Sequence, residues 1–250
     1  MRGAIIYYTG TGNTEYVAAN IKKEFGKRDI ECSIFDVRRK KSISDEYDFF
    51  VFGSPIYAEM FPELYVNWVD KNISEGRGRR CMIFSTQADD FSPGVEELSR
   101  LLEKRGFEIA VKDCIKMPNN YFLGKYKKDF REESEAIKNR ALEKVSFLVE
   151  SFLKGERIIL DVSTEKLQEG KEAYKNFMMK SKNWAKENIT VDYDLCVKCG
   201  KCSKNCPTKN ISMKDKINFA SNCISCRRCI HNCPVNAFIY KGEHFDQYKL

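Results

Sequence analysis

Short apolar runs alternate with amphipathic stretches through the first 155 residues of this 250-residue chain. An apolar run bounded by Gly or Pro predicts a buried strand, and an apolar spacing of three or four predicts a helix. The expected strands are Ala4 to Tyr8, Glu31 to Val37, Phe49 to Pro55, Arg80 to Thr86 and Phe107 to Ile115. The expected helices begin at Asn13 or Thr14, at Pro62, at Pro93 and near Glu132. Because strands and helices alternate and most strands are apolar on both faces, the pattern predicts an α/β fold, a doubly wound five-stranded parallel sheet.

Three segments do not follow this alternation. The stretch "RRKKSISDEYD" between the second and third strands is short and polar, which makes it the weakest helix position in the pattern. Residues Met117 to Arg131 are irregular and aromatic. Residues 156–188 are charged, and we expect a partly helical connector there, with Lys171 to Ala185 as its best helical candidate.

Eight of the eleven cysteines lie in two copies of one pattern, C-x2-C-x2-C-x3-C-P, which begin at Cys196 and Cys223. This spacing is that of bacterial iron–sulfur ferredoxins, in which the fourth cysteine of each run binds the other cluster. The proline after each fourth cysteine fixes φ and keeps the chain from closing over its own loop. The expected ligands of one 4Fe-4S cluster are Cys196, Cys199, Cys202 and Cys233, and those of the other are Cys223, Cys226, Cys229 and Cys206.

The chain around the cysteines agrees with this hypothesis. The stretches "ITVDYDLC" and "AFIYKG" are expected to pair as edge strands, and "NISMKDKINF" is expected to form a hairpin. Two zinc sites are the alternative, but a four-cysteine zinc site usually takes two CxxC pairs at separate points. His231 is expected to be a solvent-facing spacer. The three other cysteines fall in predicted strands, where we expect core packing: Cys32, Cys81 and Cys114.

Composition favours a soluble cytoplasmic protein. The chain is 42% hydrophobic and 32% charged, and it has neither a long apolar run nor a secretory leader. Its net charge of +7 is concentrated around the cysteines, since residues 189–250 carry 10 Lys and Arg against 5 Asp and Glu. Nucleic-acid binding is one explanation, but two clusters carrying about two negative charges each account for the excess. We therefore expect no nucleic-acid and no membrane partner, and the oligomeric state stays open.

The loop "TGTGNT" follows the first strand and opens the first helix, where a phosphate meets free backbone N–H groups. It is not a dinucleotide fingerprint, because Glu15 stands where the third Gly would be, and it is not a Walker loop. Its hydroxyls and amide suit the phosphate of FMN, and a plain Gly-rich turn is the alternative. The expected contacts are Thr9, Gly10, Thr11, Gly12, Asn13 and Thr14.

Two further loops follow the third and fourth strands, at the edge where an open α/β sheet binds ligands. Tyr57 and Phe91 are expected to stack on the flavin ring, although either could equally be an ordinary half-buried loop aromatic. Backbone groups of both loops are expected to reach the polar edges of the ring. The expected contacts are Ser54, Pro55, Ile56, Tyr57, Ala58, Ser85, Thr86, Gln87 and Phe91.

Together these motifs resemble a known family. Residues 1–155 resemble flavodoxins in the "TGTGNT" loop, the "SPIYAEMFP" loop and the five-strand alternation, and residues 189–250 resemble two-cluster bacterial ferredoxins. With "MPNNY" after the fifth strand, the chain resembles the flavodoxin–ferredoxin fusion proteins of anaerobic bacteria and archaea. The resemblance implies a flavodoxin-like FMN domain (1–155), a connector (156–188) and a small α+β two-cluster domain (189–250).

The resemblance also implies a function, the passage of electrons between two 4Fe-4S clusters, FMN and a redox protein donor or acceptor. No catalytic acid, base or nucleophile is required. The alternative is an FMN-dependent reductase of a quinone or nitro compound, with Met117 to Arg131 covering the flavin. Five basic residues near the ligands either dock an acidic partner or only offset cluster charge: Lys198, Lys201, Lys204, Arg227 and Arg228.

Overall fold

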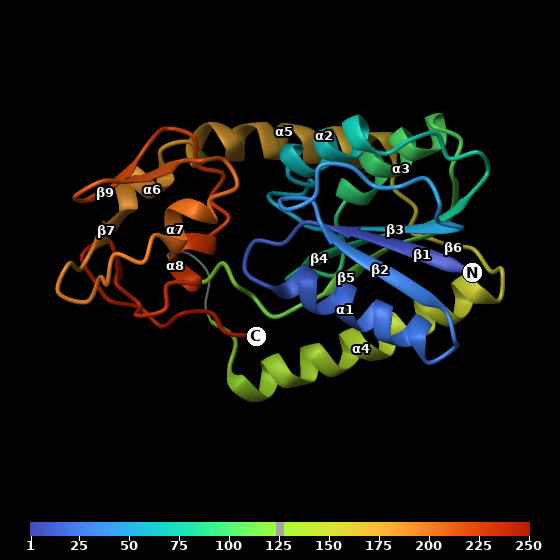
Figure 1. Ribbon diagram of the computed structural model, residues 1–250, viewed down its shortest axis with the longest axis horizontal. Coiled ribbons are helices and arrows are strands. Elements are labelled where there is room, and N and C mark those ends of the chain that lie inside the picture. The colour runs from blue at the N-terminus through green and yellow to red at the C-terminus, as the bar shows by residue number, and fades with distance from the viewer. Residues whose placement is uncertain (124–127) are drawn as a thin grey trace. The chain divides into compact units, whose positions relative to one another are not determined.

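The computed structural model describes residues 1–123 and 128–250 (Figure 1). The chain forms two compact units. The first contains Met1–Asn119 and Asp129–Tyr174, and the second contains Asn120–Lys128 and Lys175–Leu250. The irregular aromatic segment from Met117 to Arg131 is therefore divided between the units, and its residues 124–127 lie outside the described residues.

The first unit is built on a parallel sheet of six strands in the order β2-β1-β3-β4-β5-β6. The strands are β1 (Arg2–Tyr7), β2 (Glu31–Asp36), β3 (Phe49–Pro55), β4 (Arg80–Gln87), β5 (Glu108–Lys116) and β6 (Ile158–Ile159). The five predicted strands are confirmed, and their order is the doubly wound order of the flavodoxin-like fold. The predicted count of five misses β6, because a strand of two residues has no periodicity to read.

Helices cover both faces of this sheet (Figure 1). One face carries α1 (Asn13–Gly26) and α4 (Arg131–Leu153), and the other carries α2 (Glu63–Asn72) and α3 (Gly94–Lys104). The predicted helices are confirmed at all four places. Because both faces are covered, β3 is buried at every position and β4 at every position after its first.

The three cysteines outside the repeat are buried in the two cores of the sheet, as predicted: Cys32, Cys81 and Cys114. Burial raises the pKa of the Cys32 thiol to about 11, and it also raises the pKa of the Cys81 and Cys114 thiols. These thiols therefore stay protonated at neutral pH and pack as small apolar side chains.

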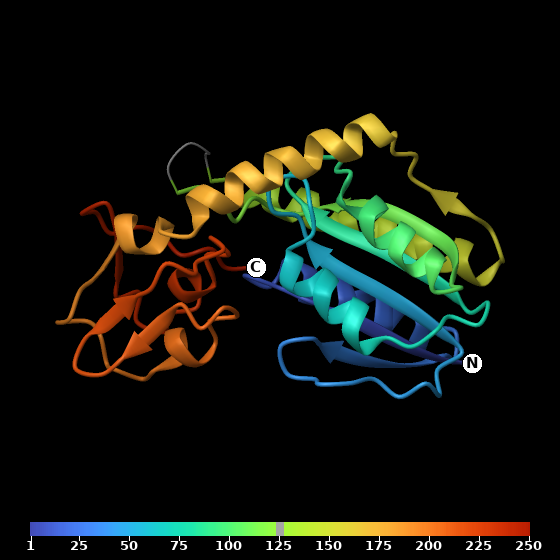
Figure 2. The same ribbon diagram turned by 90° about the horizontal axis from the view of Figure 1, so that it is seen from above.

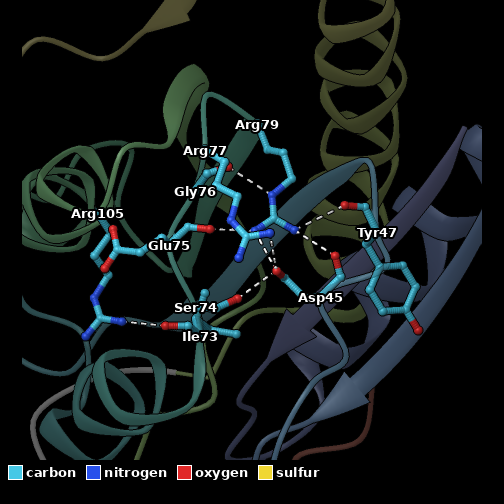
Figure 3. Close-up of polar contacts among 9 residues, drawn as sticks. All are labelled: Asp45, Tyr47, Ile73, Ser74, Glu75, Gly76, Arg77, Arg79 and Arg105. Atoms are coloured by element: carbon cyan, nitrogen blue, oxygen red, sulfur yellow. Dashed lines mark hydrogen bonds and ion pairs between the residues drawn. The ribbon is translucent and has the colours of Figure 1, made fainter.

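The connection between β2 and β3 contains no helix, although the structure describes all of its residues. Arg79 holds this loop in place (Figure 3). Its guanidinium donates to the carbonyls of Asp45 and Tyr47, and Nη2 lies 2.7 Å from Asp45 Oδ1. The guanidinium also lies 4.9 Å from the ring centroid of Phe50. Arg79 thus ties this loop to the core, together with hydrogen bonds from Ser74 to Asp45 and from Trp68 to the Lys40 carbonyl.

The second unit contains two small antiparallel strand pairs. β7 (Ile189–Val191) pairs with β10 (Phe238–Tyr240), and β8 (Ile211–Met213) pairs with β9 (Ile217–Phe219). Both predicted pairings are confirmed. Two short helices, α7 (Lys201–Lys204) and α8 (Arg228–His231), each contain the third cysteine of one run.

The segment between the sheet and the cysteines is mostly helical. α5 spans Thr164–Ser181 as one unbroken helix (Figure 2), and α6 spans Trp184–Asn188. The boundary between the two units falls within α5, after Tyr174. Within the described residues, no helix combines the length and the apolar composition that a membrane span requires.

The role of Arg79 can be measured. Arg79→Ala is expected to lower the free energy of unfolding of the first unit by roughly 2 to 4 kcal/mol, because the loop loses charge-assisted hydrogen bonds and the contact with Phe50. Arg77→Ala is the matched control, since exposed Arg77 makes an ion pair with Asp45 at 3.1 Å and should contribute less than about 1 kcal/mol. Urea unfolding followed by circular dichroism measures both values, and equal losses would contradict the assignment.

Candidate functional sites

Two cavities in the second unit are each lined by four cysteines. One is lined by Cys196, Cys199, Cys202 and Cys233, and the other by Cys206, Cys223, Cys226 and Cys229. Each cavity, counted together with the open solvent at its mouth, spans about 360 Å³ of space not filled by atoms. Across residues 1–123 and 128–250, no three His, Cys, Asp or Glu side chains are placed to hold a single metal ion. The structure brings together the same two sets of four thiols that the cysteine spacing predicts, and each set surrounds one cavity.

The two cysteine runs repeat one backbone conformation. Left-handed φ angles recur at three pairs of positions that are 27 residues apart: Lys198 and Ser225, Gly200 and Arg227, Lys209 and Asn236. The helices α7 and α8 are separated by the same interval. Positive φ is unfavourable for residues other than Gly, so its recurrence at non-glycine positions shows that the turn itself is required. The turns place the first three thiols of each run around one cavity.

Backbone amides donate to the sulfurs that complete each set. Asn210 N lies 3.2 Å from Cys206 Sγ, and Ala237 N lies 3.4 Å from Cys233 Sγ. These two donors occupy equivalent positions in the two runs. Such N–H···S bonds stabilise a thiolate and tune the potential of a cluster that it binds.

Burial disfavours free thiolates in the cavity lined by Cys206, Cys223, Cys226 and Cys229. It raises the pKa of Cys226 to about 12, and it raises the pKa values of Cys223 and Cys229. A metal centre overcomes this penalty, because coordination to the cation deprotonates the thiol. A set of four sulfur donors is also the set that soft metal centres such as iron–sulfur clusters prefer. The residues present thus fit such a cluster.

His231 is buried, so the expectation that it faces solvent is wrong. Tyr248 N donates to His231 Nδ1 at 3.0 Å, which leaves the proton on Nε2, 3.2 Å from the carbonyl oxygen of Asn120. Burial lowers the pKa of His231 to about 4, which keeps the ring neutral at pH 7. One ring therefore joins α8 to the C-terminal segment and to the segment that follows β5.

The basic residues near the cysteines are of two kinds. Lys198, Lys201 and Lys204 are exposed, whereas the side chain of Arg227 is buried. Arg227 therefore cannot contact a docking partner, which corrects that part of the docking hypothesis. The sequence alone does not reveal the difference, because arginine in a polar segment is normally exposed.

The "TGTGNT" loop joins β1 to α1 and is anchored to neighbouring strands. Thr14 Oγ1 lies 2.7 Å from Thr86 Oγ1 in β4, and Asn13 Nδ2 donates to the Pro118 carbonyl at 3.0 Å. Gly12 has a φ of 124°, a conformation that other residues rarely adopt. Gly12 is the N-cap residue of α1 and has no side chain that could cap the first turn. The backbone N–H groups of that turn are the ones that a phosphate would accept from.

The loop after β3 makes a strained turn. Ala58 and Glu59 have φ values of 41° and 75°, and Tyr57 N donates to the Met60 carbonyl at 2.8 Å. Two successive residues other than Gly in this region cost free energy, and such strain is often found at binding loops. The predicted contacts Ser54 and Pro55 end β3, directly before this turn.

The end of β4 carries a polar group that lacks a partner. Ser85 Oγ donates to Gln87 Oε1 at 2.7 Å, and Gln87 Nε2 is buried without a hydrogen-bond partner among the described residues. Phe91 follows in the loop and is 40% exposed. A flavin would supply a partner for each, because the polar edge of its ring can accept from Gln87 Nε2 and its flat apolar face can stack on Phe91. The other expected contacts lie in the loops already described, with Thr9 and Gly10 buried and Thr11, Ile56 and Tyr57 half-buried.

Helix α5 packs on these loops, which sequence reasoning missed. A Cβ at Gly170 would lie 2.7 Å from Pro93 Cγ and 3.2 Å from Met60 Sδ, so the helix approaches closely there. The hydroxyl of Tyr174 accepts a hydrogen bond from Glu63 N at 2.9 Å. The one signal in the sequence is a glycine inside a helical stretch, which often marks close packing.

Comparison with known proteins finds a family for each part of the chain. Residues 4–106 match the family model described as a flavodoxin domain, and residues 188–234 match the model described as a 4Fe-4S dicluster domain. No curated protein sequence matches the chain.

Several solved flavodoxin structures are similar to the chain at low identity. Flavodoxin 2 from Bacillus cereus has 19% identity and a TM-score of 0.45 over 62% of this chain and 99% of its own. A flavodoxin from Fusobacterium nucleatum, bound to flavin mononucleotide, has 13% identity and a TM-score of 0.44 over 62% and 99%. A flavodoxin from the domain Archaea has 11% identity and a TM-score of 0.42 over 60% and 99%.

The crossed thiol sets can be tested with two double variants. Cys206→Ala with Cys226→Ala removes two thiols from one cavity, whereas Cys206→Ala with Cys199→Ala removes one from each. If each cavity holds one cluster, the first pair should retain one intact four-iron cluster and the second pair none. Iron and sulfide analysis after anaerobic purification measures the difference, and Cys32→Ala is the control. Equal iron in both double variants would contradict the crossed sets.

Proposed function

Because the chain joins a flavodoxin domain to a 4Fe-4S dicluster domain, we propose that it transfers electrons between two 4Fe-4S clusters and an FMN. A cluster exchanges one electron and a flavin one or two, so a chain that binds both connects one-electron carriers to two-electron chemistry. The observation that carries the proposal is the pair of cavities, each lined by four thiols drawn from both cysteine runs.

The second unit supplies ligands, hydrogen bonds and a dry environment for the clusters. The amides of Asn210 and Ala237 donate to the sulfurs of Cys206 and Cys233, the thiols that cross between the runs. Apolar side chains complete the wall of the first cavity, among them Val191, Ile217 and Phe238. Such a wall limits water access, which helps to set the potential of a bound cluster. The proposed ligands are Cys196, Cys199, Cys202 and Cys233 for one cluster, and Cys206, Cys223, Cys226 and Cys229 for the other.

The first unit binds the FMN at the carboxyl edge of its sheet in this proposal. The first turn of α1 holds the phosphate, and the side chains of Tyr57 and Phe91 flank the ring. The buried Nε2 of Gln87 donates to a polar edge of the ring, which supplies its missing partner. The proposed domains remain residues 1–155 for FMN and 189–250 for the clusters, with 156–188 between them.

The packing of the segment after β5 favours electron transfer over the reductase alternative. That alternative uses Met117 to Arg131 as a cover for the flavin. In the structure Tyr121 lies against Arg227, and the Phe122 ring lies 5.4 Å from the His231 ring, all within the second unit. Tyr121 and Phe122 are half-buried, and these contacts account for both rings without a cover over the flavin.

The partner in this proposal is an acidic redox protein. Lys198 and Lys201 are exposed, and both line the cavity that also holds the exposed Cys199. Exposed cations beside a redox centre steer an oppositely charged partner towards it. The eleven free cysteines suit the reducing cytoplasm, where we place the protein.

Cofactor content is the first test of this function. Anaerobically purified protein should contain about eight irons, eight sulfides and one FMN per chain. Zinc without sulfide would contradict the cluster sites, and clusters without flavin would contradict the flavin site.

Electron transfer is the second part of that test. A reduced bacterial ferredoxin should reduce the flavin rapidly in the intact protein and at least tenfold more slowly in the Cys199→Ala, Cys206→Ala double variant. Cys32→Ala is the matched control. Fast turnover of a quinone or nitro compound in the cluster-free variant would favour the reductase instead.

A further inference from the structure

The two cavities differ in the burial of the basic residues that line them. Arg227 lines the second cavity, and its equivalent 27 residues earlier is Gly200, which lines the first. The neighbouring pair does not distinguish the cavities, because Lys201 lines the first and Arg228 lines the second. At a third pair the first cavity has the cation, because Lys198 lines it and the equivalent Ser225 does not line the second. Each cavity is thus lined by two basic residues, and Arg227 is the one of these four that is buried.

Arg227 is held in an unusual environment for a charged side chain. It is 4% exposed, and its backbone has a φ of 58°, where its twin position has glycine. The guanidinium carbon lies 3.6 Å from the ring centroid of Trp184 and 4.1 Å from that of Tyr121. The two rings hold the group by cation–π contacts from α6 and from the segment after β5.

Two nitrogens of this guanidinium remain available. Arg227 Nε and Nη1 are buried and have no hydrogen-bond partner within the described part of the chain. Burying such donors without a partner is unfavourable, and burying a positive charge without a counter-charge is more so. The missing partner has to be negative and has to accept hydrogen bonds. The second cavity, with its four thiols, is the place in this unit where such a group would bind.

We propose that Arg227 is a positioning and tuning residue that raises the reduction potential of the cluster in the second cavity. The inference rests on the proposed function, since it requires a cluster in each cavity. Reduction adds one electron, and therefore one negative charge, to a cluster that is already anionic. A fixed cation beside it stabilises the reduced form more than the oxidised form, so the second cluster takes up an electron before the first.

The exposed lysines at the first cavity do not produce the same effect. Water and salt screen a solvent-exposed charge, whereas a charge in the protein interior acts at a much lower effective dielectric constant. Lys198 and Lys201 are exposed, but Arg227 is enclosed by Trp184 and Tyr121. An arginine also keeps its charge at any accessible pH.

The test is a redox titration of the holoprotein, monitored by electron paramagnetic resonance, after iron and sulfide have been quantified. In Arg227→Gln the higher of the two potentials should fall enough to change the reduced-to-oxidised ratio of that cluster at least tenfold, which is 59 mV for one electron. The lower potential should move so little that the reduced-to-oxidised ratio of the other cluster changes less than threefold. Arg227→Lys should recover part of the shift, and Lys201→Gln is the control with the same change in net charge.

Four results separate the possibilities. Protein without iron and sulfide would refute the proposed function itself. Two clusters whose potentials are unchanged in Arg227→Gln, or fall equally, would overturn the role of Arg227. If Arg227→Gln fails to assemble the second cluster, the unaltered holoprotein decides the matter through its salt dependence. On going from low to high salt the lower potential should shift. The higher potential should shift so little that the reduced-to-oxidised ratio of its cluster changes less than threefold. Equal shifts of both potentials would overturn the proposal.

Discussion

The second unit depends on one constraint: the last thiol of each cysteine run belongs to the cavity of the other run. Cys206 lines the cavity of the later run, and Cys233 lines that of the earlier run. Neither cavity is complete until both runs have folded, so the strand pairs and short helices form around the same crossing. The apolar cluster of this unit is small, with Leu123, Ile189, Ile230 and Phe238 as its buried members. A domain with so little core would gain much of its stability from a metal centre bound by these thiols.

The carboxyl edge of the first unit depends on a comparable anchor at Thr86. Its hydroxyl lies 2.7 Å from the hydroxyl of Thr14, and its carbonyl accepts a hydrogen bond from Ile56 N at 3.1 Å. One residue at the end of β4 thus fixes the loop after β1 and the loop after β3. Loops that bind a flat cofactor need such support, because small displacements of the first contacts weaken binding. The strained turn at Ala58 and Glu59 lies directly after this anchored position.

The sequence predicts what is local and misses what depends on distant contacts. Apolar runs identify the five longer strands, and the cysteine spacing assigns the eight thiols to two sets. Both signals lie within short windows of the sequence. The short strand β6 and the packing of α5 at Gly170 arise only from tertiary contacts. His231 and Arg227 stand in a polar stretch, so the sequence favours exposure. Segments far away in the chain bury them, through Tyr248 and Asn120 for His231 and through Trp184 and Tyr121 for Arg227.

The repeated backbone of the two cysteine runs has the symmetry of two equivalent halves. One copy of the cysteine run contributes three sulfurs to one cavity and a single sulfur to the other. One copy alone therefore completes neither set of four sulfurs. Two identical half-length chains would complete both sets of four sulfurs if each supplied its last sulfur to the cavity of the other, as in a symmetric dimer. The present chain has the form that gene duplication and fusion of such a dimer would produce. In a single chain the two halves need not be identical, and an arginine at position 227 opposite a glycine at position 200 is one such difference.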